Sequence, residues 1–314
     1  MAVLVCDAGA TRIKFGIVDN GKVLAHDSIP SRSEGPLAVR LPDLAAALRG
    51  ICRMNDLPLE SCRGISMSVP SIVDVKTGRI LAEYGRFRDM PTLDLRAWAR
   101  EEFGKPLAIE NDARMACIGE WRSGAGRGCD NMVMITLGTG LGVSAVMEGR
   151  LVRGVHGQAG ILGGHITVKY GGTPCPCGNI GCAESEASTK VLADVARAHP
   201  AFPGSALARE ELLDFAAVFR NAAAGDACAL AVREHSLQVW SSLVVSLVHV
   251  YDPELFVIGG GIMASADVIL PAVRSYVERH ANTPWGKVTI VPTALGDTAA
   301  LVAGEWLLQD QFPQ

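Results

Sequence analysis

The sequence predicts a mixed α/β protein built from two similar halves. Strands and helices alternate along all 314 residues, without solenoid repeats or low-complexity segments. One pattern, a strand, a glycine turn, a second strand and a hairpin turn, occurs near the N-terminus and again from Met132. Its two turns are 12 positions apart in the first copy (Gly9 and Gly21) and 11 apart in the second (Gly138 and Gly149). We interpret this as a duplication in which each half offers one loop to a common ligand; two unrelated hairpins are the alternative.

The first half is expected to open with three strands. An apolar strand at 3–7 leads through a glycine turn to strands at 14–19 and 22–29, which an Asn-Gly hairpin turn joins. Apolar residues at helical spacing predict a helix over 41–55. The remaining expected elements are a strand at 64–74 ending in a Pro-Ser turn, a helix at 95–103, a strand at 106–112 and a helix at 113–121.

The second half repeats the opening pattern and then becomes mostly helical. A strand at 132–136, a glycine turn at 137–142 and a strand at 143–147 precede a Glu-Gly hairpin turn. The later expected elements are helical structure over 187–251, a strand at 255–261 with a helix after it, a strand at 287–295 and a helix at 298–308.

Composition excludes several classes of function. Lys and Arg number 29 against 33 Asp and Glu, a net charge of −4, so no basic face for nucleic acid or polybasic membrane tether is expected. The apolar stretch 237–251 is interrupted by polar residues and is too short for a membrane span. The N-terminal residues do not resemble a secretory leader. We therefore expect a cytoplasmic protein that binds neither nucleic acid nor membrane.

Three glycine-rich turns follow strands and are candidates for binding phosphate. In the first, backbone N–H groups and the Thr11 hydroxyl could approach a phosphate, and Asp7 at the strand end could hold Mg²⁺ through water. The second, 138–142, resembles a dinucleotide fingerprint, but a strand follows it where that fingerprint requires a helix. The third is 259–261. Each alone is compatible with an ordinary turn, and together they favour a nucleotide site.

The segment Glu110-Asn111-Asp112 stands at the end of an apolar strand and the start of a helix. Asp112 in this place is a candidate general base that takes a proton from a substrate hydroxyl as that hydroxyl attacks a phosphoryl group. Asn111 would orient the same substrate. The alternative is that Asp112 only caps the helix.

The most specific motif combines one histidine with three cysteines. His165, Cys175, Cys177 and Cys182 supply one imidazole and three thiolates, which satisfy tetrahedral Zn²⁺ and leave no open position. The closed set indicates a structural zinc; chance clustering of buried cysteines is the alternative. Glu184 follows the last of these residues by two positions, so the metal would fix a carboxylate suited to sugar hydroxyls, unless Glu184 is only a solvated surface residue.

Taken together, these motifs resemble the ROK family (repressors, open reading frames and sugar kinases). The resemblance covers nearly the whole chain and rests on the motifs at 7–14, 110–112, 138–142, 163–168, 175–184 and 257–261. It implies a two-lobed, actin-like ATPase fold, a duplicated ribonuclease H-like architecture with a zinc knuckle. The lobes would be 1–113 plus 298–314 and 114–297, with a cleft between them for ATP and sugar.

The resemblance also implies roles for individual residues. Asp112 would be the catalytic base of an ATP-dependent hexose kinase that uses Mg²⁺, and family members are often homodimers. Sugar contacts would fall on Asn111, Asp112, His165, Glu184 and Ser71. ATP contacts would fall on Asp7, Gly9, Ala10, Thr11, Lys14, Gly138, Thr139, Gly140, Gly259, Gly260 and Gly261.

The chain departs from the family pattern mainly where sugar is recognised. Ala10 replaces the second glycine of the first loop, Ser71 replaces a glycine, and Leu162 stands where a sugar-contacting Glu is usual. We interpret these departures as altered specificity for a hexose, phosphorylated most simply at O6, rather than as lost activity. The competing class is a sugar sensor without catalysis. Repressors of this family carry a winged helix-turn-helix domain ahead of the first phosphate loop. Because the first strand is expected to begin at Val3, a DNA-binding repressor is disfavoured.

Overall fold

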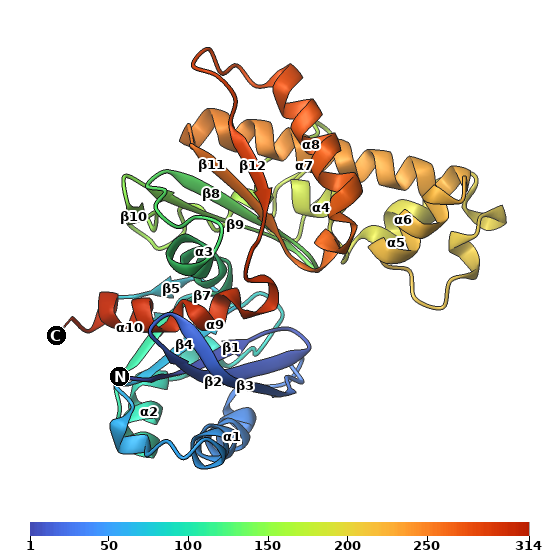
Figure 1. Ribbon diagram of the computed structural model, residues 1–314. Coiled ribbons are helices and arrows are strands. Elements are labelled where there is room, and N and C mark those ends of the chain that lie inside the picture. The colour runs from blue at the N-terminus through green and yellow to red at the C-terminus, as the bar shows by residue number, and fades with distance from the viewer. Residues whose placement is uncertain (314) are drawn as a thin grey trace. The chain divides into compact units, whose positions relative to one another are not determined.

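The computed structural model describes residues 1–313 and forms two compact units (Figure 1). The first unit contains Met1–Gly128, Arg153–Ala159 and the chain from Ala294 onward. The second contains Cys129–Val152 and Gly160–Thr293. The chain therefore passes between the units four times, after residues 128, 152, 159 and 293.

The first unit is built on a five-stranded sheet in the order β3-β2-β1-β4-β7. β1, β2 and β3 are antiparallel neighbours, whereas β4 and β7 run parallel to β1. Asn20 and Gly21 both have positive φ (51° and 69°), as the predicted two-residue hairpin requires. The bounds are β1 (Val3–Ala8), β2 (Arg12–Asp19), β3 (Lys22–Pro30), β4 (Ile65–Val69) and β7 (Leu107–Asn111).

Helices cover both faces of this sheet (Figure 1). α1 (Leu41–Met54) and α2 (Leu95–Phe103) bury their apolar stripes against one face. α9 (Ala299–Val302) and α10 (Gly304–Gln311) lie on the other, where α10 contacts β1, β4 and β7. The predicted single helix over 298–308 is thus two short helices. α3 (Asp112–Ser123) packs so closely on α9 that a Cβ at Gly119 would lie 2.0 Å from the Ala299 carbonyl oxygen.

The strand predicted within 64–74 ends at the predicted Pro-Ser turn, and the residues after that turn form a separate strand that the sequence did not reveal. β4 ends at Val69, and Val73–Asp74 form a separate short strand, β5, paired with β6 (Arg79–Ile80). Pro70 explains the break, because proline has no N–H to continue the ladder and Ser71 instead closes a tight turn onto the Val69 carbonyl.

The second unit repeats the sheet of the first. Its strand order is β10-β9-β8-β11-β12, with three antiparallel neighbours followed by two strands parallel to β8. This repetition confirms the duplicated pattern predicted from the glycine turns. The bounds are β8 (Met132–Leu137), β9 (Leu141–Met147), β10 (Arg150–Leu151), β11 (Leu255–Gly259) and β12 (Thr289–Pro292).

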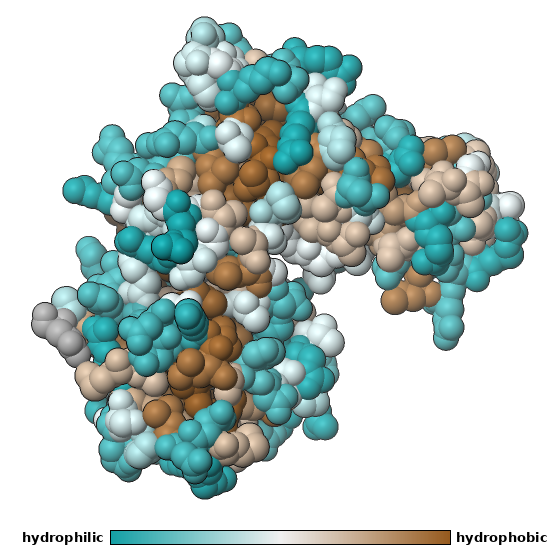
Figure 2. Space-filling model, viewed as in Figure 1, coloured by the Kyte–Doolittle hydropathy of each residue, from teal (hydrophilic) through white to brown (hydrophobic). Residues whose placement is uncertain are grey.

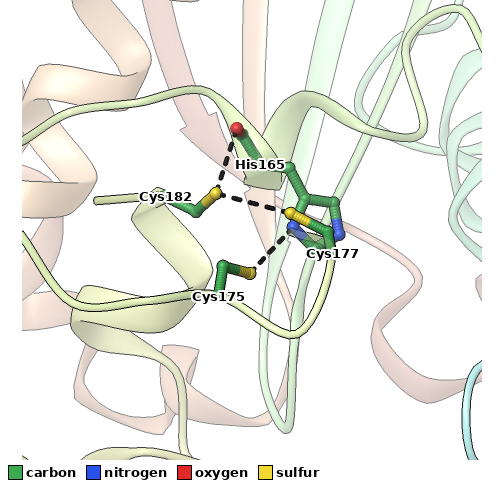
Figure 3. Close-up of side chains that lie close together, drawn as sticks. All are labelled: His165, Cys175, Cys177 and Cys182. Atoms are coloured by element: carbon green, nitrogen blue, oxygen red, sulfur yellow. Dashed lines mark hydrogen bonds between the residues drawn. The ribbon is translucent and has the colours of Figure 1, made fainter. Parts of the chain in front are cut away.

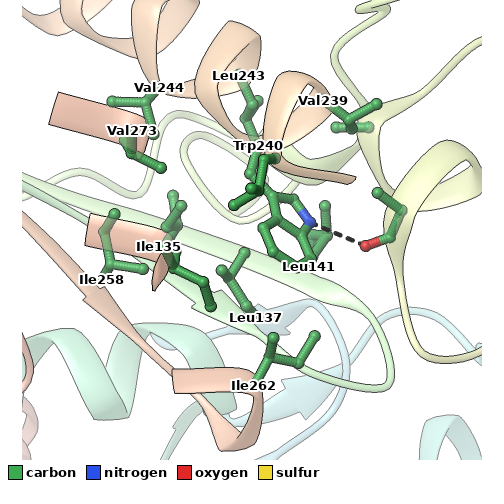
Figure 4. Packing of buried hydrophobic residues seen from close by; sticks show 14 of the residues in the cluster. Ile135, Leu137, Leu141, Val239, Trp240, Leu243, Val244, Ile258, Ile262 and Val273 are labelled. Atoms are coloured by element: carbon green, nitrogen blue, oxygen red, sulfur yellow. Dashed lines mark hydrogen bonds between the residues drawn. The ribbon is translucent and has the colours of Figure 1, made fainter. Parts of the chain in front are cut away.

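The helices of the second unit enclose its largest apolar cluster (Figure 4). Trp240 of α7 (Ala227–Tyr251) is fully buried among strand residues such as Ile135 and Leu141, and its indole N–H donates to the Ala187 carbonyl at 2.9 Å. The other helices are α4 (Ala183–Ala187), α5 (Leu192–Arg197), α6 (Phe215–Ala223) and α8 (Ala266–His280).

The helical stretch predicted over 187–251 contains three separate helices, α5, α6 and α7, and the last two begin at aspartate N-caps. Asp214 accepts a hydrogen bond from the Ala217 amide, and Asp226 accepts one from the Ala229 amide, so each begins a helix as its N-cap. No helix within residues 1–313 combines the length and apolar character needed to cross a bilayer. In Figure 2, charged and polar residues lie between the apolar areas of the visible face.

Candidate functional site

The turn from β7 into α3 places two of the predicted site residues in the first unit. The Asn111 side chain accepts a hydrogen bond from the Arg114 amide (3.2 Å), so Asn111 is the N-cap of α3. Asp112 is the first residue of the helix, which means that the capping role considered for Asp112 belongs to its neighbour. The Asp112 carboxylate is therefore not needed as the N-cap of α3.

The carboxyl of Asp112 is held in an environment that favours its protonated form. Burial, followed by the nearby charge of Asp7, raises its pKa to about 6, against weaker lowering effects of the Ala113 amide, Arg86 and Asn111. Oδ1 accepts hydrogen bonds from the Ala113 amide (2.8 Å) and from Asn111 Nδ2 (3.0 Å). A carboxylate with this pKa is ionised at neutral pH and is still basic enough to accept a proton there.

Asp7 forms the second acidic position, at the end of β1. Its carboxylate accepts a hydrogen bond from the Ser68 hydroxyl, and Ser68 lies beside Asp7 in the parallel pair β1–β4. Burial raises the pKa of Asp7, with Lys14 acting in the opposite direction. Lys14 Nζ in turn donates to the Asp297 carbonyl at 3.1 Å and lies 3.5 Å from its Oδ2.

Sequence reasoning missed Ser68 and Asp297. Ser68 could have been found, because it is a polar residue near the end of the strand expected next to that of Asp7. Asp297 could not, since 283 residues separate it from Lys14 and nothing in the local sequence connects them. Lys14, assigned to ATP, therefore already has an anionic neighbour in the first unit.

The first glycine turn is held by hydrogen bonds from the segment that follows β3. The Ser31 hydroxyl donates to the Gly9 carbonyl and the Ser33 hydroxyl to the Ala10 carbonyl, each at 2.7 Å. The Ser31 amide donates to the Thr11 carbonyl at 3.0 Å. A Cβ at Gly9 would lie 2.8 Å from the Arg12 carbonyl oxygen, so a side chain there would distort the turn. The three predicted phosphate-binding residues 9–11 thus form one braced loop.

The two glycine turns of the second unit meet at neighbouring strand ends. β8 ends at the turn 138–140, β11 ends at 259–261, and these strands are parallel partners. Gly260 has φ of 96°, and a Cβ on it would lie 2.2 Å from the Leu137 carbonyl oxygen. Within the first turn, the Gly138 amide donates to the Gly140 carbonyl at 3.1 Å. Backbone of both turns is therefore brought together by contacts that exclude side chains.

Glu184 lies against one of these turns. Its Oε2 accepts a hydrogen bond from the Leu141 amide at 2.9 Å, and it would lie 2.5 Å from a Cβ placed on Gly140. Glu184 sits in the first turn of α4, two residues after Cys182. The carboxylate is thus fixed by the glycine turn as well as by its closeness in sequence to the cysteine cluster.

His165 and the three cysteines converge as the spacing predicted (Figure 3). Their ligand atoms all lie within 4.8 Å of one another. Cys177 Sγ and Cys182 Sγ are 3.7 Å apart, and Cys175 Sγ is 3.5 Å from His165 Nδ1. Zn–S bonds of about 2.3 Å and Zn–N bonds of about 2.0–2.1 Å in a tetrahedron require edges of about 3.8 and 3.5 Å. The donor set therefore fits zinc in both chemistry and spacing.

Two further predicted sugar positions have different surroundings. Ser71 is buried, and its hydroxyl donates to the Ala82 carbonyl at 2.6 Å while its own carbonyl accepts from Asn111 Nδ2 at 3.1 Å. Leu162 precedes the short turn Gly163–His165 and is half-buried. Gly164 lies so close to β9 that a Cβ on it would be 2.1 Å from the Leu141 carbonyl oxygen.

Comparisons with known proteins agree with this arrangement. The ROK family profile matches residues 3–311. The chain belongs to the ROK family. A glucokinase of Halalkalibacterium halodurans is 33% identical over 97% of this chain and 94% of its own length. This membership and the paired sheets confirm the expected α/β, actin-like fold.

Two solved ROK structures extend the likeness to three dimensions. The ROK hexokinase of Thermus thermophilus superposes with a TM-score of 0.78 at 29% identity, over 98% of this chain and 97% of that one. A ROK family glucokinase from Streptomyces griseus, in complex with glucose and AMPPNP, gives a TM-score of 0.81 at 27% identity, over 98% of this chain and 99% of that one.

Proposed function

We propose that this ROK protein is an ATP-dependent sugar kinase that transfers the γ-phosphoryl group of MgATP to a hexose hydroxyl, O6 in the simplest case. The observation that carries the proposal is Asp112, a carboxylate with pKa raised to about 6 at the start of α3 and within the electrostatic reach of Asp7. The relatives named glucokinase, and the one bound to glucose and AMPPNP, support the same activity.

In the proposed reaction, Asp112 accepts the proton of the attacking sugar hydroxyl. The sugar oxygen forms a bond to the γ-phosphorus as the bond to the β-phosphate oxygen breaks, and ADP leaves with that electron pair. The glycine turns at 9–11 and 138–140 cradle the phosphates, Lys14 contributes positive charge, and 259–261 pass by the nucleoside. Mg²⁺, held by Asp7 through water, would neutralise phosphate charge.

The sugar contacts are assigned to Asn111, Ser71, His165 and Glu184. In the first unit, Asn111 Nδ2 reaches both Asp112 and the Ser71 carbonyl, which fixes the amide beside the base. In the second unit, His165 presents Nδ1 to the cysteine cluster. A zinc ion held by His165, Cys175, Cys177 and Cys182 would leave Nε2 to carry the ring proton as a donor to a sugar oxygen, and would order the chain leading to Glu184.

We assign the choice of sugar to the loop containing Leu162. An apolar side chain there removes one charge-assisted hydrogen bond, which is worth about 1.5–3 kcal/mol, or roughly a ten- to hundredfold change in affinity. A hexose modified near C1 or C2 would tolerate that loss. Leu162→Glu is then expected to shift the ratio of kcat/KM values toward plain glucose, and an unchanged ratio would contradict this assignment.

The activity is tested by ADP release from MgATP with a panel of hexoses, amino- and N-acetyl-hexosamines and 1-substituted glucosides. Asp112→Asn should abolish turnover, by about 10²–10⁴-fold, because the proton acceptor is lost. Asp94→Asn is the matched control, since Asp94 only caps α2 through the Ala97 amide and Asn caps equally well. Absence of turnover with every sugar, in protein shown to hold zinc, would favour a sensor instead.

Three assignments stay predictions from the sequence. These are the cytoplasmic location, the homodimer and the functional lobes 1–113 plus 298–314 and 114–297.

A further inference from the structure

α3, the helix that begins with Asp112, carries two charged side chains that are completely buried. Arg114 and Glu120 both have a relative exposure of 0%. Their polar atoms contact backbone groups at Ala125, within 153–159 and at 294–295. Those segments share one property: each lies at or near a place where the chain leaves or enters the first unit.

Arg114 holds the short stretch 153–159, which lies between two of the four crossings. Its NH2 atom donates to the Gly157 carbonyl at 3.0 Å and to the Ala159 carbonyl at 2.8 Å. Its NH1 atom pairs with Glu110 Oε1 at 3.2 Å, and Glu110 Oε2 pairs with Arg153 Nε at 2.8 Å. Glu110 and Arg114, which lie two positions before and two after Asp112, therefore both bind this stretch.

Glu120 holds the other two crossings. Its Oε2 accepts hydrogen bonds from the Ala125 amide at 2.8 Å and the Ala294 amide at 3.0 Å, and its Oε1 accepts one from the Leu295 amide at 2.8 Å. Ala294 is the first residue after the last crossing, and Ala125 lies three residues before the first. One carboxylate thus ties the ends of two connections to the helix of the base.

Stability alone does not explain this arrangement. Buried charges cost several kcal/mol each to desolvate, and apolar side chains of similar size often stabilise a protein as well or better. What a buried guanidinium or carboxylate adds is direction, because each hydrogen bond fixes the angle as well as the distance of its partner. Both charged side chains direct their hydrogen bonds at residues next to the connections between the units.

We propose that Arg114 and Glu120 are positioning residues for phosphoryl transfer: they fix the first-unit ends of all four connections on the helix that begins with Asp112. The inference rests on the proposed kinase activity. The stretch that Arg114 grips leads directly into the loop with Leu162 and His165, so the base and the sugar loop share one anchor. In-line transfer needs its groups aligned to a fraction of an ångström, which makes such an anchor consequential for the rate.

The test compares Arg114→Lys and Glu120→Gln with Val218→Ala, a cavity-forming control in α6 of the second unit. A lysine ammonium cannot reproduce the planar fork that bonds two carbonyls and a carboxylate. A glutamine amide presents an N–H₂ group to backbone donors. All proteins are measured well below their unfolding temperatures for kcat, for KM of ATP and sugar, and for amide hydrogen exchange.

We expect both α3 variants to lose at least tenfold in kcat, with KM for ATP within threefold of the unaltered protein because no glycine turn is touched. Exchange should rise in the peptides covering 153–160 for Arg114→Lys and 293–297 for Glu120→Gln. Val218→Ala should lower the unfolding temperature and leave kcat within twofold. If the variants matched the control in kcat, or lost activity without local exchange, the inference would be overturned while the kinase proposal stood. If the unaltered protein turned over no sugar and Asp112→Asn made no difference, the kinase proposal would fall, and this inference with it.

Discussion

The two sheets of this protein have the same strand order and directions and differ sharply in the side chains at their turns. β1 and β8 are each six residues long with the same pattern of burial, and their fifth residues are Asp7 and Thr136. Asp7 lies beside Ser68, and Thr136 lies beside Gly259. The first sheet therefore presents carboxylates at its strand ends, and the second presents glycine backbone.

The difference extends to the elements that follow each sheet. Asp112 and Asp297 stand near Asp7 in the first unit, whereas the second contributes Glu184 and the histidine–cysteine cluster. Under the proposed function, two similar frameworks thus contribute different groups to one reaction. In the proposed reaction, the first unit supplies the proton acceptor, the carboxylate for Mg²⁺ and one phosphate-binding turn, while the second supplies the other two glycine turns and the histidine–cysteine cluster.

The largest expected difference is between separate substitutions of the two equivalent strand residues, Asp7 and Thr136. Asp7→Asn should lower kcat by at least about 10²-fold, because the carboxylate proposed to hold Mg²⁺ through water, and with it the neutralisation of phosphate charge, is lost. Thr136→Val should cost less than about tenfold, since its hydroxyl makes only a 3.5 Å contact with the Gly142 carbonyl. Steady-state kinetics of ADP release measure both, and equal losses would show that the two halves are not specialised in this way.

A smaller loss is expected when the histidine–cysteine cluster of the second unit is broken. Cys182→Ser should remove zinc and lower activity by about 10–100-fold, because the sugar loop loses its order rather than its catalytic groups. Cys129→Ser, a half-buried cysteine of the same unit outside the cluster, is the control. Metal content by mass spectrometry is read alongside turnover. A zinc-free variant with full activity would contradict the proposed structural role of the metal.

The pH dependence of kcat/KM should report the ionisation of Asp112. Because Asp112 acts as a base only when ionised, kcat/KM is expected to fall about tenfold per pH unit below the pKa of about 6 and to level off above it. A profile without a break near pH 6, in protein that stays folded, would assign the base elsewhere.

The same pKa has a consequence for stability. A carboxyl whose folded-state pKa lies above its ordinary value of 3.8 binds protons more tightly in the folded protein, so stability falls as pH rises through this interval. Asp112→Asn should therefore raise the free energy of unfolding by about 3 kcal/mol at pH 8 and by little at pH 4. Denaturant titrations at the two pH values measure the difference.

The smallest effect should come from removing the methyl group of Ala10, which stands where the family usually has a glycine. Ala10 is not among the residues with positive φ, so its Cβ imposes no backbone strain. Ala10→Gly is expected to change kcat and KM for ATP by less than about threefold. A tenfold gain in ATP affinity would mean that the methyl group blocks the phosphate path.

The sequence by itself determined the repeated framework and the convergence of the histidine with the three cysteines. Asn20-Gly21 and Glu148-Gly149 specify hairpins because both central residues can adopt positive φ. The spacing of the cysteines predicted their convergence because a short, proline- and glycine-containing loop leaves few other arrangements. These features depend on neighbours in the chain, so local patterns reveal them.

Tertiary structure decided what depends on residues far apart. The pairing of Lys14 with Asp297 and the bonds from Glu120 to Ala294 and Leu295 join positions more than 170 residues apart, and no local pattern records them. The raised pKa of Asp112 arises from burial and from Asp7, which are properties of the folded unit. Electrostatics and backbone anchoring act through space, and for that reason only the fold could assign them.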